Sequence, residues 1–156
     1  MTIASVRKEI TVEVTQARAF RVFTEEHGAW WPLATHHIAA KPAETAIIEP
    51  FAGGRWFERA ADGEICLWGK VLAWEPPTRL VLGWQIGADW KHDPALITEV
   101  EIRFVALGPA LTRIELEHRD LERFGEAAGT LRGSFDSEGG WAGIMKLYGE
   151  RASAPV

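Results

Sequence analysis

ITEVEIRFVALGPALTRIELEHR, residues 97–119, is the stretch that decides the fold expected for this chain. In each half, every second residue shares one face of an extended backbone, and these residues are apolar apart from one histidine. They are Val100, Ile102, Phe104, Ile114, Leu116 and His118. The residues between them are mostly charged, and Gly108-Pro109 lies at the junction. The stretch therefore predicts an antiparallel hairpin with one buried face and one wet face.

Shorter strand patterns lie on the N-terminal side of this hairpin. They cover residues 5–14, 45–49, 55–59, 64–74 and 79–86. Turn sequences rich in glycine and proline separate several of them, as at Gly53-Gly54, Asp62-Gly63 and Pro76-Pro77. We therefore expect one antiparallel sheet of about six to seven strands.

A short helix is expected between the first two strands. Ala19, Phe20 and Phe23 recur at spacings of three and four, which is the period of a helix with one buried face. Thr15 is a good N-terminal cap, so the helix is predicted to run from there to about Glu26.

A longer helix is predicted at the C-terminal end, beginning at Ser137 with Asp136 and Ser137 as its cap. Its apolar positions recur at helical spacing and are Trp141, Ile144, Met145, Tyr148 and Ala152. Residues 120–134 lack a clear period and are expected to form a connection with at most a turn or so of helix. The whole chain, residues 1–156, is thus expected to be a single α+β domain.

Composition excludes several classes of partner. The chain carries 17 basic and 22 acidic side chains, a formal charge of -5, and no basic stripe that could neutralise phosphates. We therefore expect binding neither to nucleic acid nor to a membrane. One cysteine, Cys66, cannot form an internal disulfide, and the N-terminus lacks a signal-like apolar core, so a cytoplasmic location is expected.

The loop GAWWPLATHHI, residues 28–38, places two tryptophans and two histidines side by side. In an extended backbone, neighbouring side chains point to opposite faces, so we expect one of Trp30 and Trp31 in the core and the other at a cavity mouth or in solvent. Adjacent histidines such as His36 and His37 are poorly placed to chelate one ion, so no metal site is expected.

Four segments carry a family resemblance: FAGGRWFE (51–58), DGEICLWGKVLAWEPPTRLVLGW (62–84), RIELEHRDL (113–121) and GGWAGIMKLYG (139–149). They resemble homologues of the activator of heat-shock protein 90 ATPase, in the START-like (SRPBCC) helix-grip superfamily. The resemblance implies a curved antiparallel sheet wrapped around a long C-terminal helix, with a deep apolar cavity between them. That superfamily includes lipid, hormone and flavonoid binders, cyclases and ring-hydroxylase subunits, so the resemblance does not name a ligand.

Binding of a small hydrophobic or aromatic molecule in that cavity is the function we favour. Eight tryptophans against one tyrosine are consistent with a lined pocket. The expected ligand-binding residues are Trp31, Trp56, Trp68, Trp84, Ile102, Trp141, Ile144 and Met145, with His37 and His118 as polar contacts. The inward face of the strand at 64–74 is ambiguous, which leaves Trp68 the least secure of these residues.

Two other functions remain open. An enzyme of cyclase or hydrolase type would use His118 as acid or base, although the pattern favours a core histidine whose ring nitrogens bond to backbone or to a nearby carboxylate. A protein-interaction module would expose an apolar patch, such as Trp90 beside His92 or Trp74 near Pro76-Pro77. A chaperone partner is doubtful, because the chain has no room for the separate N-terminal domain through which the eukaryotic co-chaperone contacts the chaperone.

Other chemistry lacks candidates. Ser134 and Ser137 lack the setting of a nucleophilic serine, and the glycine pairs fit neither dinucleotide nor phosphate-loop spacing, so no cofactor is expected. Glu58 and Glu64 flank a turn, where glutamates are usually solvated, and no catalytic role is assigned to them.

Overall fold

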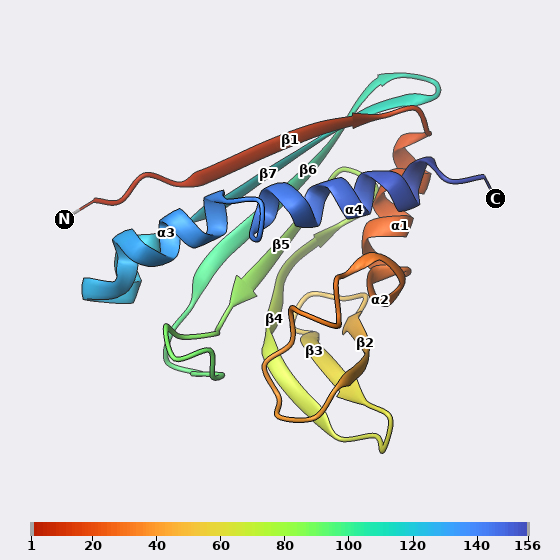
Figure 1. Cartoon of the computed structure of the whole chain (residues 1–156). Coiled ribbons are helices and arrows are strands. Elements are labelled where there is room, and N and C mark those ends of the chain that lie inside the picture. Colours follow the sequence, from red (N-terminus) through yellow and green to blue (C-terminus); the bar gives the residue numbers. More distant parts are fainter. Residues whose placement is uncertain (1, 156) are drawn as a thin grey trace.

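The computed structural model, which describes residues 2–155, contains a seven-stranded antiparallel sheet with the order β1-β7-β6-β5-β4-β3-β2 (Figure 1). The strands are β1 (Val6–Val12), β2 (Ala43–Ile48), β3 (Arg55–Ala60), β4 (Ile65–Glu75), β5 (Arg79–Trp84), β6 (Thr98–Gly108) and β7 (Leu111–Arg119). The predicted hairpin is β6 and β7, in which Ile102 pairs with Leu116. Strands β2 to β7 lie side by side in the order in which they occur in the sequence. The first strand, β1, pairs with the other edge of β7 and completes the sheet.

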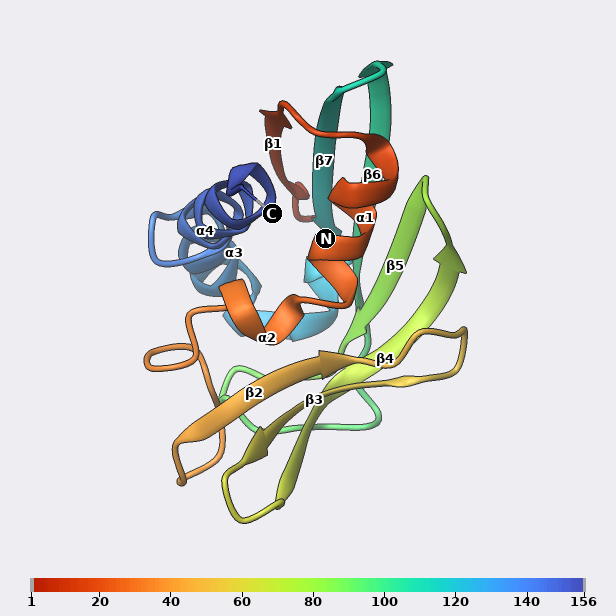
Figure 2. The same ribbon diagram turned by 90° about the vertical axis from the view of Figure 1, so that its right-hand side faces the viewer.

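The helices lie on the concave side of this sheet (Figure 2). They are α1 (Gln16–Thr24), α2 (His27–Trp30), η1 (Leu121–Ala127), α3 (Ala128–Asp136) and α4 (Trp141–Ser153). Helix α4 is the longest of them, and the sheet curls around it, so the expected helix-grip fold is confirmed. None of the helices in residues 2–155 is long and apolar enough to cross a membrane.

The start of the last helix was predicted wrongly. The expected connection at 120–134 holds η1 and most of α3, and Asp136 and Ser137 end α3 rather than cap α4. The turn that separates α3 from α4 contains Gly140, where a Cβ atom would lie 2.3 Å from the Ser134 carbonyl oxygen. Because only glycine permits this close approach, the chain turns there and α4 begins at Trp141.

Helix α4 is tied to α1 by buried polar contacts. The Tyr148 hydroxyl donates to the Ala19 carbonyl oxygen at 2.6 Å. The Arg18 guanidinium donates to the carbonyl oxygens of Ala152 and Ala154 at the end of α4. Thr15 caps α1 as predicted, accepting from the Arg18 amide. These contacts fix α4 over the sheet.

The wet face of the sheet carries ion pairs between neighbouring strands. Glu101 on β6 accepts from Arg79 on β5 and from Arg119 on β7. Partial burial would raise the pKa of Glu101, but the hydrogen bonds from these two guanidinium groups outweigh it and lower the pKa to about 2. The other face of the sheet is left free for the helices and the site.

Strands β4 and β5 approach each other closely at one position that only glycine allows. Gly69 on β4 lies so close to β5 that a Cβ atom would stand 1.7 Å from the Gly83 carbonyl oxygen. The register of β4 shifts on both sides, between Trp56 and Phe57 of its partner β3 and between Val71 and Ala73. Such bulges increase local bending.

We predict that Gly69→Ala lowers the free energy of unfolding by about 1–3 kcal/mol, because the added methyl group overlaps backbone atoms that cannot move independently. The matched control is Gly133→Ala in α3, where a Cβ meets nothing within 4 Å and alanine is the better helix former. That variant should gain about 0.5–1 kcal/mol. Urea denaturation measures both, and equal effects would contradict the prediction.

Candidate functional site

A cavity of about 530 Å³ lies between the sheet, the α3–α4 turn and the loop after α2. We call that loop, residues 31–42, the mouth loop. Six of the ten residues expected to bind ligand line the cavity, including Trp68, whose orientation the sequence left ambiguous. They are Trp31, His37, Trp68, Trp84, Trp141 and Ile144.

The other four expected residues are not part of the cavity wall. Trp56, Ile102, His118 and Met145 are all buried and at most 1 % exposed. They belong to the core behind the wall, because residues on one apolar face of a sheet can pack on a helix without reaching the space between them. Periodicity shows which face is buried and cannot separate core from cavity.

The indole N–H groups of four wall tryptophans point into the protein. Trp31 donates to the His36 carbonyl oxygen at 2.9 Å, and Trp84 donates to that of Ile86 at 3.0 Å. The other two donate to buried side chains: Trp68 to Glu58 Oε1 at 2.7 Å and Trp141 to His118 Nδ1 at 3.1 Å. Because their donors are already satisfied, these side chains present apolar ring surface to the cavity.

The two adjacent tryptophans divide between core and cavity, as expected. Trp30 packs on Phe23 and Tyr148 and donates to the Val22 carbonyl oxygen, whereas Trp31 lines the cavity. The backbone is not extended, however, because Trp30 ends the short helix α2 and only Trp31 has extended dihedral angles. The change of backbone conformation between them separates the two side chains.

Glu58 was expected to be solvated and is instead 2 % exposed. Its carboxylate accepts from the Ile38 amide at 2.7 Å and from the Ala39 amide at 3.4 Å, besides the Trp68 indole. It therefore joins the mouth loop to β4 from its position on β3. The prediction that Glu58 is solvated was wrong because the mouth loop folds over β3 and covers this side chain. That loop lies 20 residues earlier in the chain, so the position of Glu58 near a turn could not indicate it.

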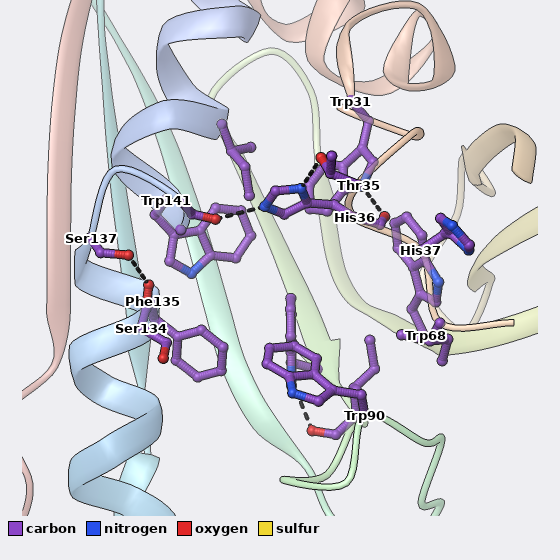
Figure 3. A pocket seen from close by; sticks show the side chains of 16 residues that line it. Trp31, Thr35, His36, His37, Trp68, Trp90, Ser134, Phe135, Ser137 and Trp141 are labelled. Atoms are coloured by element: carbon purple, nitrogen blue, oxygen red, sulfur yellow. Dashed lines mark hydrogen bonds between the residues drawn. The ribbon is translucent and has the colours of Figure 1, made fainter. Parts of the chain in front are cut away.

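His36, which sequence reasoning passed over, bridges the cavity mouth (Figure 3). Its Nε2 lies 2.6 Å from the Gly139 carbonyl oxygen and so donates to it. Its Nδ1 then accepts from the Thr35 hydroxyl at 2.7 Å. This contact links the mouth loop to the α3–α4 turn, 103 residues later in the chain. No pattern in the sequence distinguishes His36 from its neighbour.

His37 is one of the lining residues of the cavity, and one of its ring nitrogens is engaged. Its Nδ1 donates to the Ala39 carbonyl oxygen at 3.0 Å and lies 3.9 Å from a carboxylate oxygen of Glu58. Within residues 2–155 its Nε2 makes no hydrogen bond to protein. The ring therefore offers a polar contact to whatever enters.

His118 has both ring nitrogens occupied. Nδ1 accepts from Trp141, so the neutral ring carries its proton on Nε2, which donates to the Thr98 hydroxyl at 2.8 Å. Burial lowers the pKa of His118 to about 3. His27 is similarly buried; it accepts from the Trp56 indole, and burial lowers its pKa to about 3 as well. Both histidines are neutral core residues.

Metal ligands do not converge in this site. Within the described part of the chain, no three His, Cys, Asp or Glu side chains are placed to hold an ion together. His36 and His37, the adjacent pair, point to different partners, a carbonyl oxygen of Gly139 and one of Ala39.

The model of the family described as activator of Hsp90 ATPase homolog 1-like protein matches residues 13–146. The chain belongs to this family. Activator of Hsp90 ATPase homolog 1-like chains have the START-like helix-grip fold seen here, which is a ligand-binding fold. No curated protein sequence matches the chain.

Solved structures similar to this family member cover nearly all of it. The anthrahydroquino-gamma-pyrone synthase Txn09 is 33 % identical, with a TM-score of 0.66 over 96 % of this chain and 97 % of that one. CalC from Micromonospora echinospora, a self-sacrificing resistance protein, is 28 % identical, with a TM-score of 0.69 over 95 % and 93 %. Protein MLL2253 from Mesorhizobium loti, 18 % identical with a TM-score of 0.67 over 95 % and 96 %, shows the fold alone.

The two buried histidines predict a loss of stability in mild acid. Below their ordinary pKa near 6.5 they take up protons in the unfolded chain but stay neutral in the folded one down to about pH 3. Each should therefore lower the free energy of unfolding by about 1.4 kcal/mol per pH unit over that window. In His118→Gln, the change in the free energy of unfolding between pH 6 and pH 5, measured by urea denaturation, should be smaller by about this amount. An unchanged slope would show that His118 ionises in the fold.

Replacing the buried carboxylate should loosen the cavity wall. Glu58→Leu removes Oε1, which accepts from both the Trp68 indole and the Ile38 amide, so we expect a loss of about 1–3 kcal/mol of stability. Glu44→Leu, on an exposed side chain of β2, is the control and should change stability little. Thermal denaturation compares the two variants, and a neutral Glu58→Leu would refute the anchoring role.

Proposed function

We propose that the chain binds a small, uncharged, flat aromatic molecule in the cavity beneath the mouth loop. The observation that carries the proposal is the wall itself, on which tryptophan side chains expose ring surface while four of their N–H groups are satisfied within the protein. Aromatic rings gain from stacking and edge contacts beyond simple burial of area, so such a wall favours a flat aromatic occupant.

The charge and size of the cavity restrict the class of ligand further. None of the lining residues is Asp, Glu, Lys or Arg, so a charged ligand would lose its hydration without gaining a counter-ion. The volume of about 530 Å³ lies within the range of small-molecule pockets, about 300–1,000 Å³. An uncharged molecule of a few fused rings fits both limits.

A few polar groups at the mouth suit oxygen substituents on such a molecule. His37, Thr35 and Ser134 line the cavity and can donate to or accept from a hydroxyl or carbonyl group. The 33 % identical synthase supports the same class, since its name refers to an anthrahydroquinone and a γ-pyrone, both oxygen-bearing ring systems. A hydroxylated polycyclic aromatic is therefore the ligand class proposed.

The test is a titration of tryptophan fluorescence with 1,8-dihydroxyanthraquinone, checked by calorimetry. Ser134→Phe places a bulky side chain at the cavity mouth, whereas Thr130→Phe places it at an exposed position on the same helix, outside the lining. We expect saturable one-to-one quenching in the wild type and in Thr130→Phe, and at least tenfold weaker binding in Ser134→Phe. A flat titration of the wild type, or equal binding by both variants, would count against the cavity.

Ring closure of a bound substrate is a second candidate function. It is favoured by the 33 % sequence identity to the synthase, which extends over 96 % of this chain. His118 is not suited to proton transfer there, because both its nitrogens are hydrogen-bonded within the core. His37 is the better candidate, because it lines the cavity and its Nε2 has no hydrogen bond to protein within residues 2–155. If the chain is an enzyme, His37→Gln lowers the turnover of a polyketide-type substrate more than its affinity; if it only binds, affinity alone changes.

A further inference from the structure

Trp90 differs from the other tryptophans of the cavity. It lies in the loop after β5, lines the cavity and is nevertheless 47 % exposed (Figure 3). Its ring meets the edge of Phe135 at 6.5 Å and 88°. One side of this indole is therefore supported by the α3 wall, and much of the rest remains open to the cavity mouth.

The backbone of Trp90 adopts a conformation that large residues avoid. Its φ angle is +59°, in the left-handed region that favours glycine. The loop holds it there, because the Trp90 amide donates to the Gly87 carbonyl oxygen and the Gly87 amide donates to that of Lys91. A bridge between Ile86 and His92 closes the loop below. Strain of this kind, imposed by surrounding structure, is typical of functional positions.

The indole N–H of Trp90 also has no protein acceptor within the described residues. Four other cavity tryptophans donate their N–H to protein acceptors, whereas within residues 2–155 the Trp90 Nε1 makes no such bond. A donor without a protein acceptor, on a half-exposed side chain at the mouth of an apolar cavity, is free to meet an oxygen on a ligand. Position, backbone conformation and unused donor thus all favour a role in ligand recognition.

We propose that Trp90 is a specificity-determining clamp, whose ring packs against the mouth end of the bound ring system and whose indole N–H, on the edge of that ring, donates to a ligand carbonyl oxygen. The proposal rests on the binding function proposed above and adds a preference to it. The cavity should discriminate between flat ring systems of the same size according to whether they carry a carbonyl group near the mouth.

The experiment compares 9,10-anthraquinone with anthracene, which share a tricyclic skeleton and differ in the two carbonyl groups. Their affinities are measured for the wild type, Trp90→Phe, Trp90→Gly and the control Phe51→Ala, which removes another exposed aromatic side chain, outside the cavity lining. Phenylalanine keeps an aromatic ring at the mouth without the donor. Glycine removes the ring and suits the positive φ angle, so it weakens binding without lowering the melting temperature.

We expect the wild type and Phe51→Ala to prefer anthraquinone, Trp90→Phe to lose about fivefold of that preference, and Trp90→Gly to bind both probes at least tenfold more weakly. If Trp90→Gly binds both probes with the affinity of the wild type, the clamp is overturned and the binding function of the cavity stands. Equal affinity of the wild type for the two probes overturns the carbonyl preference. Failure of both probes to bind the wild type removes the binding function and the clamp with it.

Discussion

The hydrogen bond from the Trp141 indole to His118 Nδ1 joins the first residue of α4 to strand β7, and much of the molecule depends on it. It orients the Trp141 ring toward the cavity, and it requires the His118 proton to lie on Nε2, where Thr98 accepts it. The contact is fully buried, so a lost partner would leave a polar atom without water. With the Arg18 guanidinium of α1 bound to the carbonyl oxygens of Ala152 and Ala154 at the other end, α4 is held at both ends over the curved sheet.

This arrangement separates the polar atoms of the site from the surface that a ligand would touch. Tryptophan side chains bring both a large apolar ring and one donor, and a cavity built from them works as an apolar cavity only if the donors are satisfied elsewhere. Glu58 and His118 accept two of those donors from behind the wall. The buried polar residues of this protein are therefore part of the machinery that makes the cavity apolar.

The mouth is built differently from the wall. The wall rests mostly on strands and on α4, with Trp31 added from the mouth loop, whereas the mouth is made by three connecting segments: the mouth loop, the α3–α4 turn and the loop that carries Trp90. His36 joins the first two through Gly139, and Phe135 supports Trp90. Loops positioned by a rigid scaffold commonly carry specificity, which is consistent with polar groups gathering at the mouth of this cavity.

The sequence by itself determined the sheet, the two principal helices and the residues of the buried face, because strand and helix periods are local properties of the chain. It also indicated a tryptophan-rich cavity, and several of its residues, such as Trp84 and Trp141, lie on the wall. Tertiary structure alone decided the burial of Glu58, the bridge made by His36, and the placement of His118 behind the wall instead of on it. Each depends on a partner from another element, from 20 to 103 residues away, and no local pattern records which of several chemically similar side chains will meet it.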